Sequence, residues 1–490
     1  MGLFEALINA LLSHPLLAIV FLSASFCLAR CIYRVTLHPL AHIPGPLLWR
    51  ISSLCLYYHS YIGDEATVIR LAHARYGSLV RVSPNEVDIG DADAINPIYV
   101  SKGGFLKAPC YANFDIDGHS TIFSTLDPEH RALRAKAVVP MFSTKNIRDN
   151  ESALYRCVDR MVDRMQEEAK TGRPVNVLNL SRSLAVDAVS THLFQENYNG
   201  TSEKGKTLSV SAFVDAFVAV GRFFYLPNTA FVWLEWATEK CFPNEHTATS
   251  MQVVDKFVEQ LVDATLQGAQ NYPGRLMPLG IEKTEVMAQC KDLIFAGTDS
   301  TGMNVATICR FLALHPDKYE ILRREVLANS DAGEKKQEIH ALPYLTGVVK
   351  EGLRLSMANP TRLPHVVPRG GWTFKGTHFP AGAFVGCSAT ELHLNPQAYP
   401  NPYDFQPERW LEGNITPEAS KSFFAFGAGS RACIARNLAT VELYMATEKM
   451  AEKDVLRGAK AVQDKIEIYE WFNSSVKGEK IELIWEKASI

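Results

Sequence analysis

The segment that ends at Cys433 holds the residues best suited to chemistry. It reads Phe426-Gly427-Ala428-Gly429-Ser430-Arg431-Ala432-Cys433, so two glycines and an arginine precede a cysteine that opens an expected helix. Free N–H groups at a helix start and a nearby arginine both stabilise a thiolate, which is a metal ligand. Cys433 is therefore a candidate metal ligand, and the alternative is a buried structural cysteine at a tight turn.

The same segment fits part of a nucleotide-binding fingerprint, because Gly427, Gly429 and Ala432 have the spacing of a GxGxxA motif. That motif needs a following strand that ends in an acidic residue, which binds the ribose. We find no such strand in the sequence after Ala432, so we do not expect a dinucleotide site.

Three further motifs carry charged or hydroxyl side chains. Glu351 and Arg354 stand three residues apart, so they share a helix face and can pair. Arg409 follows in a long aperiodic loop, within Phe405-Gln406-Pro407-Glu408-Arg409-Trp410. Ala296-Gly297-Thr298-Asp299-Ser300-Thr301 places an acid–alcohol pair after a mid-helix glycine, which costs about 1 kcal/mol. Taken singly, these motifs also fit a solvated helix face or a packing notch.

Together and in this order, the four motifs closely resemble the signature of the cytochrome P450 family, the haem-thiolate monooxygenases. The resemblance covers essentially the whole chain and is of the filamentous-fungal, microsomal, secondary-metabolism type. It implies the P450 fold and a haem b whose iron is bound axially by Cys433. It also implies that Glu351, Arg354 and Arg409 form a buried triad that fixes the loop carrying the thiolate.

The resemblance assigns further residues to the haem. The segment Asp127–Arg134 is similar to the family's WxxxR helix, with His130 in the place of the tryptophan and Arg134 in the place of the arginine, and both would meet a haem propionate. Arg431 would contact a propionate, and His365 matches a position that is often a third donor. The expected cofactor-binding residues are Cys433, Arg431, His130, Arg134, His365 and Phe426.

Proton delivery is assigned in the same way. Activation of O2 needs protons, and the resemblance implies a relay of Asp299 with Ser300 or Thr301. Ser300 stands where the family usually has threonine, His130 replaces the commoner tryptophan, and Ala435 stands where the family generally has glycine. None of these departures removes a group that the chemistry requires.

The family's substrate pocket would lie in two stretches, residues 107–127 and 213–236. For the second stretch the alternative is aromatic side chains in the core or against a membrane. The apolar character favours a lipophilic substrate such as a polyketide or terpenoid intermediate. The candidate pocket residues are Tyr111, Phe114, Phe123, Phe217, Phe223 and Ala296.

The expected activity is hydroxylation or epoxidation. We find no flavin or iron–sulfur motif, so the resemblance implies electrons from a membrane-bound NADPH–cytochrome P450 reductase, with cytochrome b5 as a further donor. Arg436 and other basic residues near Cys433 could steer the reductase's acidic surface. The alternatives are a haem-thiolate isomerase, dehydratase or cyclase that needs no external electrons, and a non-catalytic haem-binding protein.

The N-terminus contains a candidate membrane span. From Ala6 to Ala29 no residue is formally charged, and 24 helical residues span roughly 36 Å, enough for a bilayer core of about 30 Å. Arg30 and Arg34 follow at once, which places the remainder in the cytoplasm by the positive-inside rule. We expect a single-pass anchor in the endoplasmic reticulum rather than a cleaved signal peptide, with residues 1–34 as anchor, 35–50 as a proline-rich hinge and 51–490 as the catalytic domain.

Composition agrees with a globular catalytic domain. The net charge of −3 gives no reason to expect nucleic acid as a partner, and the ten cysteines include no CxxC pair. Helical periodicity dominates and strand-like alternation is short, so we predict a mainly α fold with small sheets. The expected helices are 64–75, 129–137, 151–169, 180–195, 208–222, 249–268, 283–315, 316–329, 343–356 and 433–452. The expected strands are 79–82, 86–89, 373–374, 384–385 and a C-terminal pair, 466–471 and 480–485.

Overall fold

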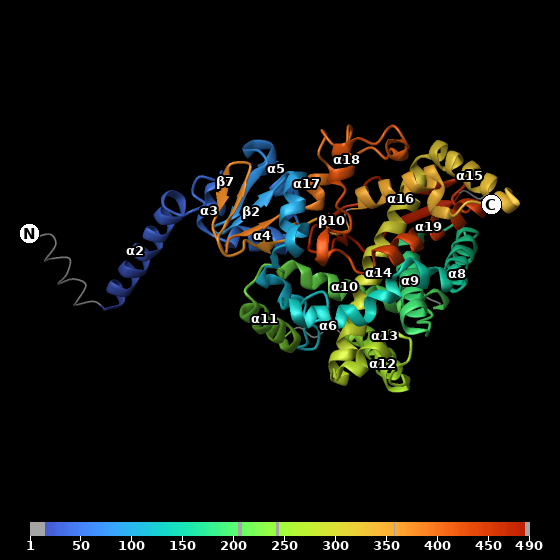
Figure 1. Cartoon of the computed structure of the whole chain (residues 1–490), viewed down its shortest axis with the longest axis horizontal. Coiled ribbons are helices and arrows are strands. Elements are labelled where there is room, and N and C mark those ends of the chain that lie inside the picture. The colour runs from blue at the N-terminus through green and yellow to red at the C-terminus, as the bar shows by residue number, and fades with distance from the viewer. Residues whose placement is uncertain (1–14, 204–207, 242–244, 357, 486–490) are drawn as a thin grey trace, which may run out of the picture.

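The computed structural model describes residues 15–203, 208–241, 245–356 and 358–485. A large helical body forms one part of the molecule, and most of the strands lie toward the end from which the N-terminal helix projects (Figure 1). The helices are α2 (Pro15–Thr36), α3 (Leu47–Ile51), α4 (Leu54–Ile62), α5 (Glu65–Tyr76), α6 (Pro128–Val138), α7 (Thr144–Asp149), α8 (Glu151–Ala169), α9 (Val177–Val189), α10 (Ser209–Val220), α11 (Asn228–Cys241), α12 (Glu245–Ala264), α13 (Tyr272–Leu276), α14 (Lys283–Leu314), α15 (Pro316–Ser330), α16 (Pro343–Ser356), α17 (Ala389–His393), α18 (Pro417–Ser422) and α19 (Arg436–Glu452).

The long helix α14 is the centre of the helical body. It is buried along most of its length and packs against α9, α16 and α19. The closest approach is to α9, because a Cβ at Gly302 would lie 2.6 Å from Cγ and 2.9 Å from Cα of Arg182. Small residues thus let two helices meet almost backbone to backbone, which fixes the position of α14 in the core.

The largest sheet has five strands in the order β1-β2-β8-β5-β3. All of its neighbours are antiparallel except β2 and β8, and Lys107 on β3 pairs directly with His365 on β5. The sheet therefore brings two basic side chains from distant parts of the sequence together. Its strands are β1 (Leu79–Ser83), β2 (Glu86–Ile89), β3 (Leu106–Lys107), β5 (His365–Val366) and β8 (Phe384–Gly386).

The smaller sheets correct one expectation. The C-terminal segments 466–471 and 480–485 were expected to pair with each other, but β10 pairs with β11, and β12 pairs with β4 and β9. Alternation identifies a strand but does not identify its partner, and one partner of β12, the strand β4, lies far away in the sequence. These strands are β4 (Val175–Asn176), β6 (Trp372–Phe374), β7 (Thr377–Phe379), β9 (Ala459–Ala461), β10 (Ile468–Tyr469), β11 (Ser475–Val476) and β12 (Glu482–Trp485).

The predicted fold class, mainly α with small sheets, is confirmed. Residues 18–36 of α2 are long and apolar enough to cross a membrane, and nearly all of the described side chains of α2 are exposed. The first part of the expected span, residues 6–14, lies outside the described residues. After α2 the chain turns through the prolines, and Arg50 ties this segment to the body by donating to the carbonyls of Val35 (3.0 Å) and Ala41 (2.8 Å).

Candidate active site

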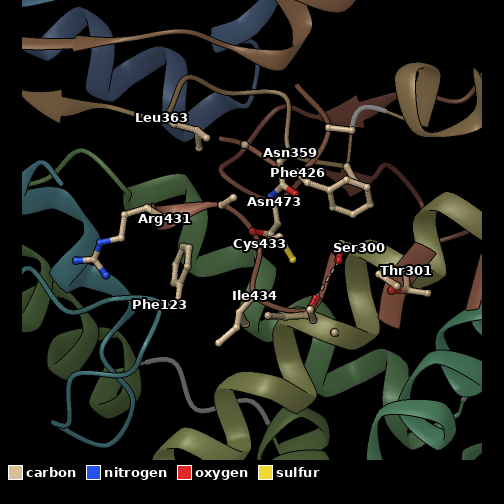
Figure 2. A pocket seen from close by; sticks show the side chains of 18 of the residues that line it. Phe123, Ser300, Thr301, Asn359, Leu363, Phe426, Arg431, Cys433, Ile434 and Asn473 are labelled. Carbon is tan, nitrogen blue, oxygen red and sulfur yellow. Dashed lines mark hydrogen bonds between the residues drawn. The ribbon is translucent and has the colours of Figure 1, made fainter. Parts of the chain in front are cut away.

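A cavity of about 270 Å³ lies inside the helical body, beside α14 and the loop that carries Cys433. Since one water molecule needs about 10–15 Å³ on this scale, the space equals roughly 20 waters. Figure 2 shows Cys433 and Ile434 on the cavity wall, with Ser300 and Thr301 of α14 near them and Asn359 and Asn473 on the same side as Phe426. The cavity is therefore where the sequence motifs converge.

The loop before α19 directs the Cys433 side chain into this cavity. Gly427 and Gly429 have φ values of +66° and +69°, which favour glycine, and a Cβ at Gly429 would collide with the Tyr99 carbonyl oxygen. The Cys433 N–H donates to the Phe426 carbonyl at 2.9 Å and closes the loop. Ala435 has φ −90° and ψ 10°, so its backbone does not require the glycine that is usual there.

The electrostatics of Cys433 differ from the expectation. The Ala435 N–H at the helix start and the Arg436 side chain favour the thiolate, whereas Arg431 was the arginine expected to do so. Burial outweighs both contributions and raises the pKa of the Cys433 thiol. The side chain is open to the cavity while protein encloses that cavity. A bound metal ion is the kind of charge that deprotonates such a thiol.

The expected triad is assembled, with Glu351 and Arg354 fully buried and Arg409 partly buried. Arg354 donates to both oxygens of Glu351, at 2.9 and 2.7 Å, and Arg409 donates to the same carboxylate at 3.1 Å. Arg354 also donates to the carbonyls of His393 at the end of α17 (2.9 Å) and of Pro402 in the long loop (2.6 Å). Glu351 is satisfied further by the Trp410 indole N–H at 2.8 Å. This network joins α16 to the loop that leads to Cys433.

One part of the cavity wall is strongly basic. Lys107, Arg131, Arg431 and His365 line it, and burial together with mutual repulsion lowers the pKa of Lys107 well below its ordinary value and that of Arg431 to about 10. Burial also lowers the pKa of His365 to about 4. Asp292, whose pKa burial raises to about 6, is the acidic side chain that faces Lys107. Crowded basic groups of this kind, with Lys107 buried and Arg131 and Arg431 half-buried, fit the two carboxylates of a haem, so the residues present fit the cofactor.

His130 and Arg134 do not line the cavity. Arg134 forms an ion pair with Glu285 of α14, donating from Nη2 at 2.8 Å, and His130 Nε2 lies 3.5 Å from the same carboxylate. Arg131, between them, reaches the cavity instead. Sequence reasoning missed Arg131 and Lys107, although both lie in segments that it singled out. The helical period does not reveal whether Arg131 or Arg134 faces a cavity. Lys107 lies on the two-residue strand β3, which gives no periodic signal.

The proposed relay residues are divided between the wall and the core. Ser300 and Thr301 line the cavity, and Ser300 Oγ donates to the Ala296 carbonyl at 3.0 Å (Figure 2). Asp299 lies behind them, where it accepts from buried Arg182 at 2.8 Å and from the Asn473 side chain. Burial raises the pKa of Asp299 although both partners oppose this.

Most of the expected pocket residues lie on the wall. Phe223 does not, since it lines a separate cleft against α4. The aromatic stretch 213–236 is divided, because Phe213, Phe224 and Phe231 are buried whereas Trp233 and Trp236 are 65% and 57% exposed. The expected residues that do line the cavity are Tyr111, Phe114, Phe123, Phe217, Ala296 and Phe426.

Glu442 of α19 is a further lining residue that the sequence did not indicate. It is 1% exposed, and neither carboxylate oxygen has a hydrogen-bond partner. Burial raises its pKa well above the ordinary value, which favours the neutral form of the side chain.

Comparison with known proteins agrees with this site. Residues 43–453 match the family model described as cytochrome P450. The chain is 36% identical over 500 residues to cytochrome P450 monooxygenase mfmF of Annulohypoxylon moriforme, covering 96% of this chain and 99% of the relative. It is 28% identical over 463 residues to the fusicoccadiene C-8 hydroxylase of Alternaria brassicicola, covering 88% and 87% of the two chains.

Proposed function

The chain belongs to the cytochrome P450 family and is a monooxygenase, and from this premise we propose that it hydroxylates or epoxidises a lipophilic fungal secondary metabolite, a polyketide or terpenoid intermediate. The observation that carries the proposal is the placement of the Cys433 sulfur in a largely apolar cavity that also has a cluster of buried cations. Relatives named as a monooxygenase and a terpene hydroxylase support the substrate class.

The proposed cofactor is haem b, whose iron Cys433 would hold. Lys107, Arg131 and Arg431 would bind its propionates, with His365 beside them. When bound, the haem supplies the iron at which O2 is activated, and a thiolate ligand favours cleavage of the O–O bond. The triad of Glu351, Arg354 and Arg409 positions the cysteine loop through the contacts of Arg354 with the carbonyls before it.

The other residues would deliver protons and exclude water. The Ser300 hydroxyl donates to a backbone carbonyl, which leaves its lone pairs able to accept from water in the cavity. Burial raises the pKa of Asp299, which would help this carboxylate to take up a proton, and Asn473 connects it to the cavity wall. Aromatic side chains such as Phe114 and Phe217 would orient an apolar substrate.

We further propose that the protein is anchored in the endoplasmic reticulum membrane by a single pass, with its catalytic domain in the cytosol. The apolar helix α2 supports the anchor. Exposed Trp233 and Trp236 on α11 support a second contact with the bilayer, because tryptophan prefers the membrane interface. Electrons would come from an NADPH–cytochrome P450 reductase, with cytochrome b5 as a further donor, and Arg436, exposed at the start of α19, supports docking near Cys433.

The test is the absorption spectrum of the reduced, carbon monoxide-bound protein, purified with its haem. We expect the Soret band of a thiolate-ligated haem in the wild type and its loss in Cys433→Ala, whereas Cys309→Ala, which removes a thiol buried away from the cavity, should keep it. An unchanged thiolate-type band in Cys433→Ala would contradict the assignment of the ligand.

A further inference from the structure

Two asparagines on the cavity wall are brought together by neighbouring segments. The segment after α16 and the turn between β10 and β11 run side by side, because the Ser474 N–H donates to the Ala358 carbonyl at 2.9 Å. A second bond joins them, from Nδ2 of Asn359 to the Phe472 carbonyl at 3.2 Å. Asn359 and Asn473 both line the cavity and lie on the same side of it in Figure 2.

Both amides have a defined orientation. Asn359 presents its nitrogen to the Phe472 carbonyl, which can only accept. Asn473 presents its nitrogen to Asp299, which accepts as the ionised partner of Arg182. An amide has two N–H groups and one carbonyl oxygen, so each asparagine retains one N–H and its oxygen. Some side-chain nitrogen and oxygen atoms of the described residues are buried without a hydrogen-bond partner, and the amide oxygens of Asn359 and Asn473 are not among them. This agrees with two oxygens that open onto the cavity.

The wall around the two amides is apolar, with Phe114, Phe217 and Phe472 among its side chains. A bound hydrocarbon would remove water from the free amide groups and replace none of their hydrogen bonds, which is costly for each buried polar group. A hydroxyl group can donate to one carbonyl oxygen and accept from one N–H, so it can bond to both amides at once. A carboxylate cannot do so at neutral pH, since it only accepts.

We propose that Asn359 and Asn473 form a subsite for a hydroxyl group, and that the substrate is a lipophilic alcohol or phenol rather than a hydrocarbon. This inference rests on the proposed function and specifies its substrate class. It follows that the preceding reaction must leave a hydroxyl group on the substrate, and that this monooxygenase acts on a molecule that already carries oxygen.

The test compares two probes that differ in one hydroxyl group, 4-heptylphenol and heptylbenzene, by titration of the purified holoenzyme and measurement of the Soret shift. Partition into an apolar cavity alone favours heptylbenzene, so tighter binding of the phenol reports hydrogen bonding. We expect the phenol to bind about ten-fold more tightly, within the range for a buried hydrogen-bonding site. Asn359→Leu and Asn473→Leu should each reduce this ratio, and the double variant should abolish it.

Two variants control for other effects. Phe217→Leu changes the apolar wall without removing a hydrogen-bonding group, so its ratio should stay near that of the wild type. Asn359 has no contact with Asp299 among the described hydrogen bonds, so Asn359→Leu tests the subsite separately from the buried ion pair of α14.

The inference is overturned if the wild type binds both probes equally, if neither probe shifts the Soret band, or if the phenol preference survives in the double variant. Failure of the proposed function looks different, since the wild type would then lack the spectrum of a thiolate-ligated haem. A normal haem-thiolate spectrum without a phenol preference contradicts the hydroxyl subsite alone.

Discussion

The buried cations at the cavity are the most specific feature at the scale of single residues. The Lys107 ammonium group donates to the Phe123 carbonyl at 2.6 Å and lies 4.0 Å from the ring centres of Tyr111 and Phe123. Among the hydrogen bonds of the described residues, none joins Lys107 to a carboxylate. Arg431 likewise donates to a backbone carbonyl, that of Thr125, at 2.6 Å. An anion such as a haem propionate would stabilise this cluster, so we expect haem binding to stabilise the folded protein.

Arg131 and Arg134 separate two accounts of haem binding. Because Arg131 lines the cavity and Arg134 is paired with Glu285, Arg131→Gln should weaken haem retention by roughly ten-fold or more, the value of one charge-assisted bond. Arg134→Gln should lower the melting temperature with little change in the rate of haem loss. The measurement is haem transfer to an excess of apomyoglobin, and faster loss from Arg134→Gln than from Arg131→Gln would contradict the structural assignment.

Glu442 makes stability depend on pH. Its pKa is raised in the folded protein above the ordinary value near 4.5. At a pH between these two pKa values, the unfolded chain releases the Glu442 proton while the folded chain retains it. The free energy of unfolding therefore falls as pH rises through this window. Glu442→Gln does not titrate and should gain stability relative to the wild type between pH 5 and pH 8, measured as the difference in melting temperature.

The control for this prediction is Glu418→Gln, at an exposed position on α18, whose difference from the wild type should stay within about 0.5 kcal/mol across the same pH range. A constant difference between Glu442→Gln and the wild type over that range would mean that Glu442 ionises normally in the folded protein.

At the scale of elements, most helices and the strands β1, β2, β6 and β8 were predictable, whereas the pairing of strands and the shortest strands were not. The expected helices 151–169 and 343–356 have the observed bounds, because their apolar residues recur with the helical period over many turns. Strands of two residues, such as β3 and β5, give no periodic signal, yet their pairing brings Lys107 to His365. The amide pair was also not predictable, because Asn359 and Asn473 are juxtaposed by contacts between segments far apart in the sequence.

The contact between α9 and α14 should be intolerant of added volume. Gly302→Ala places a methyl group against the backbone of Arg182, so we expect a loss of about 1–3 kcal/mol in the free energy of unfolding. The same displacement should disturb the bond between Arg182 and Asp299. Thermal unfolding of the holoenzyme measures the effect, and a melting temperature equal to that of the wild type would contradict the close packing.

At the scale of the whole molecule, many of the exposed apolar side chains lie on the elements at one end. Figure 1 shows α2 projecting at the end where α3, α4 and α11 also lie. The contacts agree, since α2 touches α3, α3 touches α4, and α4 touches the short turn before α11. A bilayer that holds α2 would therefore lie near the exposed tryptophans of α11.

This arrangement predicts residual membrane binding without the anchor. A chain lacking residues 1–36 should still sediment in part with phospholipid vesicles, and Trp233→Ser with Trp236→Ser should lower the bound fraction several-fold, because interfacial binding scales with buried apolar area. The control is Tyr403→Ser, which removes an exposed aromatic side chain from a loop. Replacement of Trp410 is not a suitable control, because that side chain is buried. A truncated chain that stays fully in solution would contradict the second contact.

The most direct test of the central account is to express the intact gene and Cys433→Ala in one host, each with its reductase, under heavy-isotope dioxygen. The account predicts that the intact protein yields a product with one or more labelled oxygen atoms, and that the variant accumulates the unlabelled precursor that lacks them. Products of equal mass, or products that differ only by water, would contradict oxygen insertion and favour a haem-thiolate isomerase or dehydratase.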